Sequence, residues 1–153
     1  MKIKKFNFKK VYSTNKTAIK IINNTKLNYG MIVSESQKNG KGQYGRNWIS
    51  FKGNLFVSFF YNIDNINFSI KKLTRINCLL VKKVISRFYK KEIFFKSPND
   101  LLINKKKISG ILQEIIVKDN KKYLVVGIGI NIIKSPNITN YPTTNLLEII
   151  DKK

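Results

Sequence analysis

Residues 37–48 form a segment whose residue types suit the binding of an anion. Within it stand three glycines, Gly40, Gly42 and Gly45, with Lys41 and Arg46 next to them. Glycines let backbone N–H groups approach a ligand closely, and the cations attract negative charge. Trp48, the only tryptophan, supplies either a flat face for a purine or a cap on the core. We predict a loop that binds a phosphate or an adenylate; a mobile turn is the alternative, because the usual phosphate-loop spacing is absent.

A second segment, residues 96–100, breaks at Pro98 and then presents two polar residues. We expect the side chains of Asn99 and Asp100 to face a pocket, where they would hold a ribose, a Mg²⁺ ion or a nucleophilic amine. The alternative is an ordinary turn, since Pro-Asn-Asp is a common turn sequence.

Lys107 is the third candidate. It is the last of three consecutive lysines and stands directly before the apolar run that begins at Ile108. We therefore expect its side chain to point inward, whereas the alternative makes all three lysines a solvated turn.

A fourth segment, residues 126–131, alternates glycines with apolar residues and ends at Asn131. Glycines in a strand mark places where another backbone or a ligand comes close. Asn131 then delivers a polar group to the same region.

The spacing of apolar residues predicts the elements that position these segments. An opening strand lies within residues 3–11, Ser13 or Thr14 caps a short helix, and strands follow at residues 30–34 and 55–61. A long amphipathic helix is predicted over residues 70–88, with an apolar face made of Leu73, Ile76, Leu80, Val84 and Phe88.

The second half of the chain changes to short strands at residues 101–103, 108–117 and 123–132, separated by tight lysine-rich turns. This pattern predicts an antiparallel meander, and residues 144–150 predict a last short helix. The fold class is therefore α+β, with a mixed, largely antiparallel sheet flanked by helices.

Length and composition limit the function classes. With 153 residues, 42% of them hydrophobic, the chain suits a single globular domain. Cys78, the only cysteine, excludes an intrachain disulfide and a cysteine-rich zinc site, and the absence of histidine excludes Ser/His/Asp and metalloprotease chemistry. No apolar run reaches the roughly 18 residues that span a bilayer, so we expect a cytoplasmic protein without a membrane partner.

The formal net charge of +22 is compatible with nucleic-acid binding. However, only three of the 30 basic residues are arginines: Arg46, Arg75 and Arg87. Lysine, asparagine and isoleucine, all abundant here, have A/T-rich codons, and arginine is the residue that bidentate recognition favours. We attribute the charge to a biased genome, and a basic nucleic-acid-binding module is kept as an alternative.

In this order, the segments resemble the signature of biotin protein ligases, which runs STN, Q followed by GRGRxGRxW, KWPND, KxxGIL and GIGIN. The matching positions are residues 13–15, residue 37 with 40–48, residues 96–100, 107–112 and 127–131. The resemblance spans most of the chain and implies a ligase catalytic domain over residues 1–153, with a class II synthetase-like fold. It implies an enzyme that makes biotinyl-5′-adenylate from biotin and ATP, with Mg²⁺, and transfers biotin to a lysine of a biotin carboxyl carrier protein.

The resemblance also implies roles for individual residues. Lys107, Lys41 and Asp100 would be catalytic, with Asp100 orienting the carrier's lysine or holding Mg²⁺. The residues implied to bind biotin are Ser13, Thr14, Asn15, Gln37, Lys41, Gly42, Gln43 and Lys107. Those implied to bind ATP or the adenylate are Gly40, Gly45, Arg46, Trp48, Asn99 and Asn131.

The chain departs from the family pattern in several places. Lys41 and Gln43 stand where the pattern has arginines, so we expect a looser hold on the adenylate, since glutamine donates no charged bidentate contact. Ser97 replaces the tryptophan of KWPND. We expect neither the helix-turn-helix region nor the C-terminal β-domain of some relatives. Without the helix-turn-helix region, we expect no specific DNA binding. Both a monomer and a homodimer are compatible with the sequence. A lipoate or octanoate ligase or transferase of the same superfamily is the nearest alternative. In those relatives a histidine lies near the glycine-rich segment, whereas this chain has no histidine.

Overall fold

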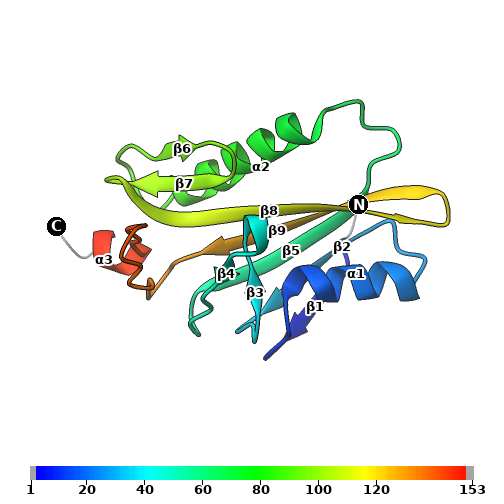
Figure 1. Ribbon diagram of the computed structural model, residues 1–153, viewed down its shortest axis with the longest axis horizontal. Helices are drawn as coiled ribbons and strands as arrows, with labels where there is room; N and C mark the ends of the chain where they lie inside the picture. Colours follow the sequence, from blue (N-terminus) through cyan, green and yellow to red (C-terminus); the bar gives the residue numbers. More distant parts are fainter. Residues whose placement is uncertain (1–2, 151–153) are drawn as a thin grey trace.

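The computed structural model describes residues 3–150, arranged as Figure 1 shows. Its elements are β1 (Lys5–Phe8), α1 (Thr14–Asn24), β2 (Tyr29–Ser34), β3 (Gly40–Lys41), the 3-10 turn η1 (Gln43–Gly45), β4 (Asn47–Trp48), β5 (Leu55–Asn62), α2 (Ile70–Ile85), β6 (Phe94–Lys96), β7 (Asp100–Ile103), β8 (Lys106–Lys118), β9 (Lys121–Ile130) and α3 (Leu146–Ile150). No helix in this part of the chain is long and apolar enough to cross a membrane.

Seven of these strands form one mixed sheet in the order β1-β2-β5-β9-β8-β7-β6. Each neighbouring pair is antiparallel except β1 and β2, which are parallel. Strands β3 and β4 make a separate hairpin. The α+β class and the antiparallel meander, here β7, β8 and β9, are confirmed. The short edge strand β6 was not predicted, and the loop expected at residues 37–47 contains the β3–β4 hairpin.

The sheet separates two cores, one under each long helix (Figure 1). Residues alternate in direction along β9, so that Val125 packs with α1 while Leu124 and Val126 pack with α2. On the α1 side, Ala18 and Ile22 are fully buried. Because Gly127 and Gly129 continue the sequence parity of Val125, they lie on the α1 face of the sheet.

The buried face of α2 agrees with the predicted one only at its start, where Leu73 is buried. Leu80, Val84 and Phe88 are 56%, 51% and 63% exposed, and the helix ends at Ile85. The other buried residues are Thr74, Cys78, Val81 and Ile85. Apolar residues cover more than one stripe of this helix, so spacing alone did not identify the stripe that faces the sheet. The buried stripe includes a threonine, whose hydroxyl bonds the Ile70 carbonyl at 2.9 Å and Gln113 Oε1 at 2.5 Å.

Helix α1 is fastened to β8 at both ends. At its N-terminus, Asn15 Nδ2 donates to Glu114 Oε2 at 2.7 Å. At its C-terminus, Lys118 Nζ donates to the carbonyl oxygens of Ile22 and Thr25 at 2.8 and 2.6 Å. A cation at this end also interacts favourably with the helix dipole. The first turn of α1 is therefore fixed relative to β8.

Asn54, immediately before β5, fixes the chain that follows β9. Its Oδ1 accepts from the backbone N–H groups of Ile132, Ile133 and Lys134 at 2.9–3.2 Å, and its Nδ2 donates to the Lys134 carbonyl at 2.6 Å. The side chain thus replaces a strand partner for residues just after Asn131.

Candidate active site

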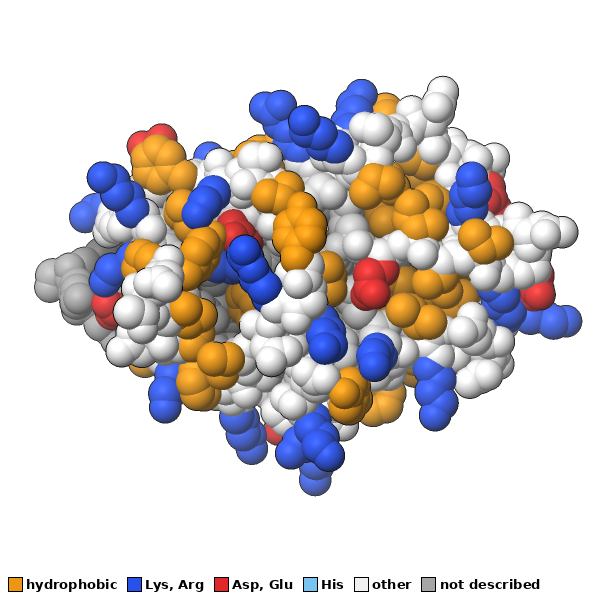
Figure 2. Space-filling model, in the orientation of Figure 1, with side chains coloured by type: hydrophobic (Ala, Val, Ile, Leu, Met, Phe, Trp, Pro, Cys, Tyr) orange, Lys and Arg blue, Asp and Glu red, His pale blue; other side chains and the backbone are white. Residues whose placement is uncertain are grey.

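A pocket of about 510 Å³ lies on the α1 face of the sheet, between the β3–β4 hairpin, the start of α1 and the segment that precedes α3. Figure 2 shows this hollow left of centre, with Lys and Arg side chains at its rim. The structure brings nearly all of the predicted site residues to its lining: Ser13, Thr14, Asn15, Gln37, Lys41, Gly42, Gln43, Arg46, Trp48, Asn99, Asp100, Lys107 and Asn131. Gly40 and Gly45 do not line it.

The hairpin turn over the pocket explains the positions of these two glycines. A β-carbon at Gly40 would lie 2.5 Å from the Trp48 carbonyl oxygen, so Gly40 lets the two hairpin strands pair closely. Gly45 has φ of +73° and follows Tyr44 at +56°, a left-handed turn that favours glycine. Both residues shape the loop rather than contact the pocket.

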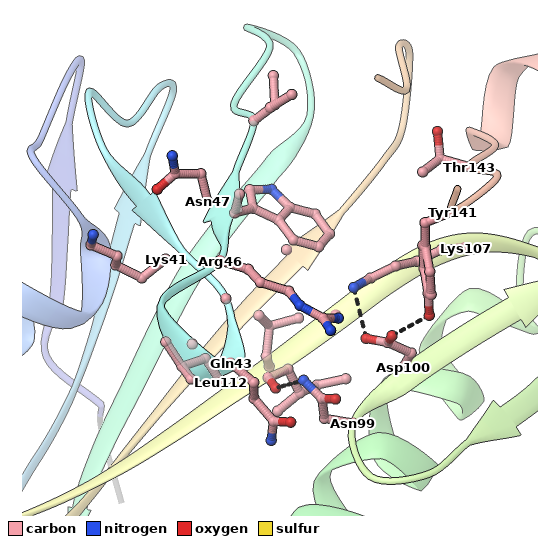
Figure 3. Close-up of a pocket in the computed structure, with 18 of the residues that line it drawn as sticks. Lys41, Gln43, Arg46, Asn47, Asn99, Asp100, Lys107, Leu112, Tyr141 and Thr143 are labelled. Carbon is pink, nitrogen blue, oxygen red and sulfur yellow. Dashed lines mark hydrogen bonds and ion pairs between the residues drawn. The ribbon is translucent and has the colours of Figure 1, made fainter. Parts of the chain in front are cut away.

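The two cations of the hairpin point in different directions (Figure 3). The guanidinium of Arg46 points across the pocket toward Asp100 and Lys107, whereas the ammonium of Lys41 points away from them. Of the three residues expected to be catalytic, the structure therefore brings together Lys107 and Asp100 but not Lys41.

The indole of Trp48 packs against two glycines of the sheet, Gly110 and Gly129. A β-carbon at Gly129 would stand 2.5 Å from its Cε2, and one at Gly110 would stand 2.8 Å from its Cζ3. The indole Nε1 is buried and, among the described residues, has no hydrogen-bond partner. Trp48 thus covers the sheet and also lines the pocket, while its role as a face for a purine stays a prediction.

Thr14 and Gln37 line the pocket at the start of α1. Gln37 Oε1 accepts from the backbone N–H of Thr14 at 2.8 Å and from its hydroxyl at 3.1 Å, while Nε2 donates to Ser50 Oγ at 3.1 Å. Ser13 is the N-cap of α1, as predicted, but its hydroxyl makes no capping bond. The buried Ser13 and Thr14 present polar groups at the first turn of this helix.

Asn15 is fully occupied by protein contacts. Besides its bond to Glu114, its Oδ1 accepts from Ser58 Oγ at 2.6 Å. A β-carbon at Gly127 would lie 2.3 Å from that oxygen, so Gly127 makes room for the amide. Asn15 thereby positions the start of α1, and its partners Ser58 and Glu114 were not anticipated from the sequence.

Asp100 and Lys107 form an ion pair in the pocket wall, as the dashed line in Figure 3 marks. Lys107 Nζ lies 2.8 Å from Asp100 Oδ1, and the two side chains are only 20% and 14% exposed. The expected inward direction of Lys107 is confirmed, while Lys105 and Lys106 are exposed. The hydroxyl of Tyr141 donates to the second oxygen, Oδ2.

Tyr141 is a pocket residue that sequence reasoning missed. It stands in the segment between β9 and α3 and belongs to none of the motifs; the only local signal is the following Pro142, which favours extended backbone. Burial, reinforced by the hydrogen bond to Asp100, raises the pKa of its phenol well above the ordinary value. The phenol is therefore neutral and acts as a hydrogen-bond donor.

Asn99 and Asn131 are both buried. Asn99 Nδ2 donates to the Ile111 carbonyl at 2.7 Å, which fixes the bend after Pro98. Asn131 Nδ2 donates to the Thr144 carbonyl at 3.1 Å, but its Oδ1 is buried with no partner in the described part of the chain. A buried acceptor of this kind is costly unless a ligand or water satisfies it.

The pocket does not fit a metal ion held by protein side chains. Asp100 is the sole carboxylate in its lining, and Lys107 and Tyr141 engage both of its oxygens. Within residues 3–150, no group of three or more histidine, cysteine, aspartate or glutamate side chains could hold a metal.

Fold and pocket together define a class of protein: an α+β domain with a pocket on one face of a mixed sheet, whose lining holds more cations than carboxylates. The chain belongs to the biotin/lipoate A/B protein ligase family, whose model matches residues 8–131. It is 33% identical over 127 residues to the bifunctional ligase/repressor BirA of Bacillus subtilis, covering 82% of this chain and 39% of that protein.

Solved structures agree with this assignment. The biotin protein ligase of Aquifex aeolicus in complex with biotin and ATP superposes with a TM-score of 0.81 at 30% identity, covering 97% of this chain and 62% of that one. The ligase of Leishmania major in complex with biotinyl-5-AMP, at 24% identity and a TM-score of 0.82, shares the fold; 99% of this chain and 66% of that one are covered. The chain thus spans about four tenths of the curated relative's length.

Proposed function

We propose that this chain is the catalytic domain of an ATP-dependent biotin protein ligase that works in the cytoplasm on a biotin carboxyl carrier protein. The observation that carries the proposal is the charge of the pocket. Its lining holds four cations, Lys41, Arg46, Lys96 and Lys107, against the single carboxylate of Asp100. Membership of the ligase family and the biotin and ATP bound by the Aquifex relative support the same reading.

In the first step, an oxygen of the biotin carboxylate attacks the α-phosphorus of ATP, and the bond from that phosphorus to pyrophosphate breaks. Pyrophosphate leaves with the electron pair. The two reacting groups are anions that repel one another, so the site must neutralise charge with groups already in place. Lys107 and Arg46 point toward the same part of the pocket and can supply this neutralisation.

The polar groups in the pocket lining suggest where each end of the ligand binds. We assign the acyl end to the first turn of α1, where Ser13, Thr14 and Gln37 present polar groups to the ureido ring. The adenine end falls at Trp48 and Asn131, whose buried Nε1 and Oδ1 need polar partners. Mg²⁺ enters with ATP as part of the substrate, since magnesium binds substrate phosphates and keeps several waters.

In the second step, the carrier's lysine attacks the adenylate as a neutral amine. Its nitrogen forms a bond to the acyl carbon, the bond from that carbon to the phosphate oxygen breaks, and AMP leaves. The proton lost by the nitrogen passes to Asp100, which lies beside the same cations. An amide-linked biotinyl-lysine and AMP are the products.

The proposal is tested by mixing the protein with Mg²⁺, ATP and either biotin or lipoate, and measuring pyrophosphate release and acyl-adenylate. We expect adenylate with biotin only. Replacing Lys107→Ala should lower the rate by about 100-fold, whereas the exposed neighbour variant Lys106→Ala should match the wild type. Adenylate formed with lipoate instead would favour the sister activity, and no adenylate with either acid would refute the ligase function.

A further inference from the structure

Two groups meet at the Asp100 carboxylate, one at each of its oxygens. Lys107 Nζ takes Oδ1 at 2.8 Å, and the Tyr141 hydroxyl takes Oδ2. Figure 3 shows Lys107 and Tyr141 converging on the carboxylate from the same side of the pocket. A proton from an incoming amine reaches Oδ1 directly once Lys107 Nζ has moved away from it.

The two partners differ in what a ligand does to them. Lys107 is a flexible cation at the pocket wall, and an adenylate brings negative charge that competes for it. Tyr141 is a neutral donor, so an anion does not attract it away from Asp100. Once Lys107 turns to the adenylate, Oδ1 is vacated while Oδ2 is still held by Tyr141.

Resting on the proposed ligase function, we propose that Tyr141 is a positioning residue for the transfer step, whose hydroxyl holds Asp100 in the orientation that receives the attacking lysine amine. It acts through Asp100 and touches neither the acyl carbon nor the phosphate. The step itself is the one written above: nitrogen bonds to the acyl carbon, AMP leaves, and the nitrogen's proton goes to the vacated Oδ1.

The backbone around Tyr141 is built to keep it in place. The N–H of Lys107 donates to the Pro142 carbonyl at 2.8 Å, and the N–H of Thr144 donates to the Lys107 carbonyl at 2.9 Å. The segment that carries Tyr141 is therefore hydrogen-bonded to both the N–H and the carbonyl of Lys107, the residue that forms the ion pair.

The ring of Tyr141 also lies between two cations. Lys96 Nζ is 4.4 Å from its centroid and Lys107 Nζ is 5.3 Å away, both within the range of cation–π attraction. The raised pKa of the phenol means that the hydroxyl stays protonated at the pH of the reaction. The donor is therefore preorganised before the substrate arrives.

The test separates the two half-reactions in the variant Tyr141→Phe, which removes only the hydroxyl. Pyrophosphate release with biotin and ATP reports the first step, and transfer from preformed biotinyl-adenylate to the carrier lysine reports the second. We expect the first rate to stay within about twofold and kcat of the second to fall about 10-fold or more, with KM for the carrier unchanged. Tyr29→Phe, on β2 and outside the pocket, is the matched control.

A double-mutant cycle with Asp100→Asn sharpens the result. If Tyr141 acts through Asp100, adding Tyr141→Phe to Asp100→Asn should cost no further transfer rate. A transfer rate within twofold of wild type, an equal loss in both half-reactions, or additive losses in the cycle would each overturn the role. A wild-type protein that forms no adenylate would instead refute the ligase function on which this role rests.

Discussion

The indole of Trp48 lies so close to Gly129 that a β-carbon on the glycine would stand 2.5 Å from Cε2 of the ring. We expect Gly129→Ala to push the indole toward the pocket, because β9 is paired with β5 on one side and β8 on the other, which holds the position of residue 129. We expect KM for ATP to rise about 10-fold in adenylate formation, with little change in KM for biotin, whose proposed end of the pocket is at α1. Pyrophosphate release at varied ATP measures this; an unchanged KM for ATP would show that the indole does not contact the nucleotide.

Neighbouring residues of α2 should respond very differently to truncation. Ile85 is 1% exposed and packs against the sheet, so Ile85→Ala should lower the free energy of unfolding by about 3 kcal/mol. Val84 is half exposed, and Val84→Ala should change the free energy of unfolding by less than about 0.5 kcal/mol. Urea unfolding of the two variants makes the comparison, and similar losses would mean that the helix buries a different stripe.

Cys78 should make stability depend on alkaline pH. Burial, with a smaller effect of the Asp100 charge, raises the pKa of this thiol to about 12 from an ordinary 9.0. The unfolded chain then releases its thiol proton first, so the contribution to stability is complete below about pH 9 and is lost as pH rises toward about 12.

We expect the free energy of unfolding to fall more between about pH 8 and about pH 10 in the wild type than in Cys78→Ala. Comparing the change with pH, rather than the absolute value, removes the effect of the cavity that alanine leaves. Equal changes in the two proteins would show that the thiol titrates normally in the fold.

Asn54→Ala should loosen the chain beyond β9. Three backbone N–H groups would lose their shared acceptor, so we expect a loss of about 2 kcal/mol in the free energy of unfolding. Asn67→Ala, at an exposed loop position, is the control and should have almost no effect. Hydrogen exchange at Ile132 provides a local readout, and protection there equal to that in the wild type would contradict the assignment.

The sequence was most informative where a residue stood beside a strong local pattern. Lys107 adjoins an apolar strand, which favoured an inward side chain over the solvated-turn alternative, and the glycines at 127 and 129 predicted the close approach that Asn15 and Trp48 make. Alternating apolar residues likewise predicted the meander of β7, β8 and β9, because its strands pair with sequence neighbours.

What escaped prediction depends on contacts between distant parts of the chain. The α2 face was misjudged because a polar Thr74 is buried through a bond to Gln113, a partner far away in sequence. Tyr141 reaches Asp100 across 41 positions and belongs to no pattern. The contacts of the Asn15 amide with Ser58 and Glu114, 43 and 99 positions away, were likewise not anticipated.

The fastening of α1 to β8 has a consequence for substrate length. The strand that holds the first turn of the helix through Leu112 and Glu114 also carries Lys107. The distance between the first turn of α1 and Lys107 is therefore set by the length of one extended strand, at about 3.3 Å per residue. This length is set by covalent geometry, so under the proposed function we expect the site to discriminate acyl chains by their reach.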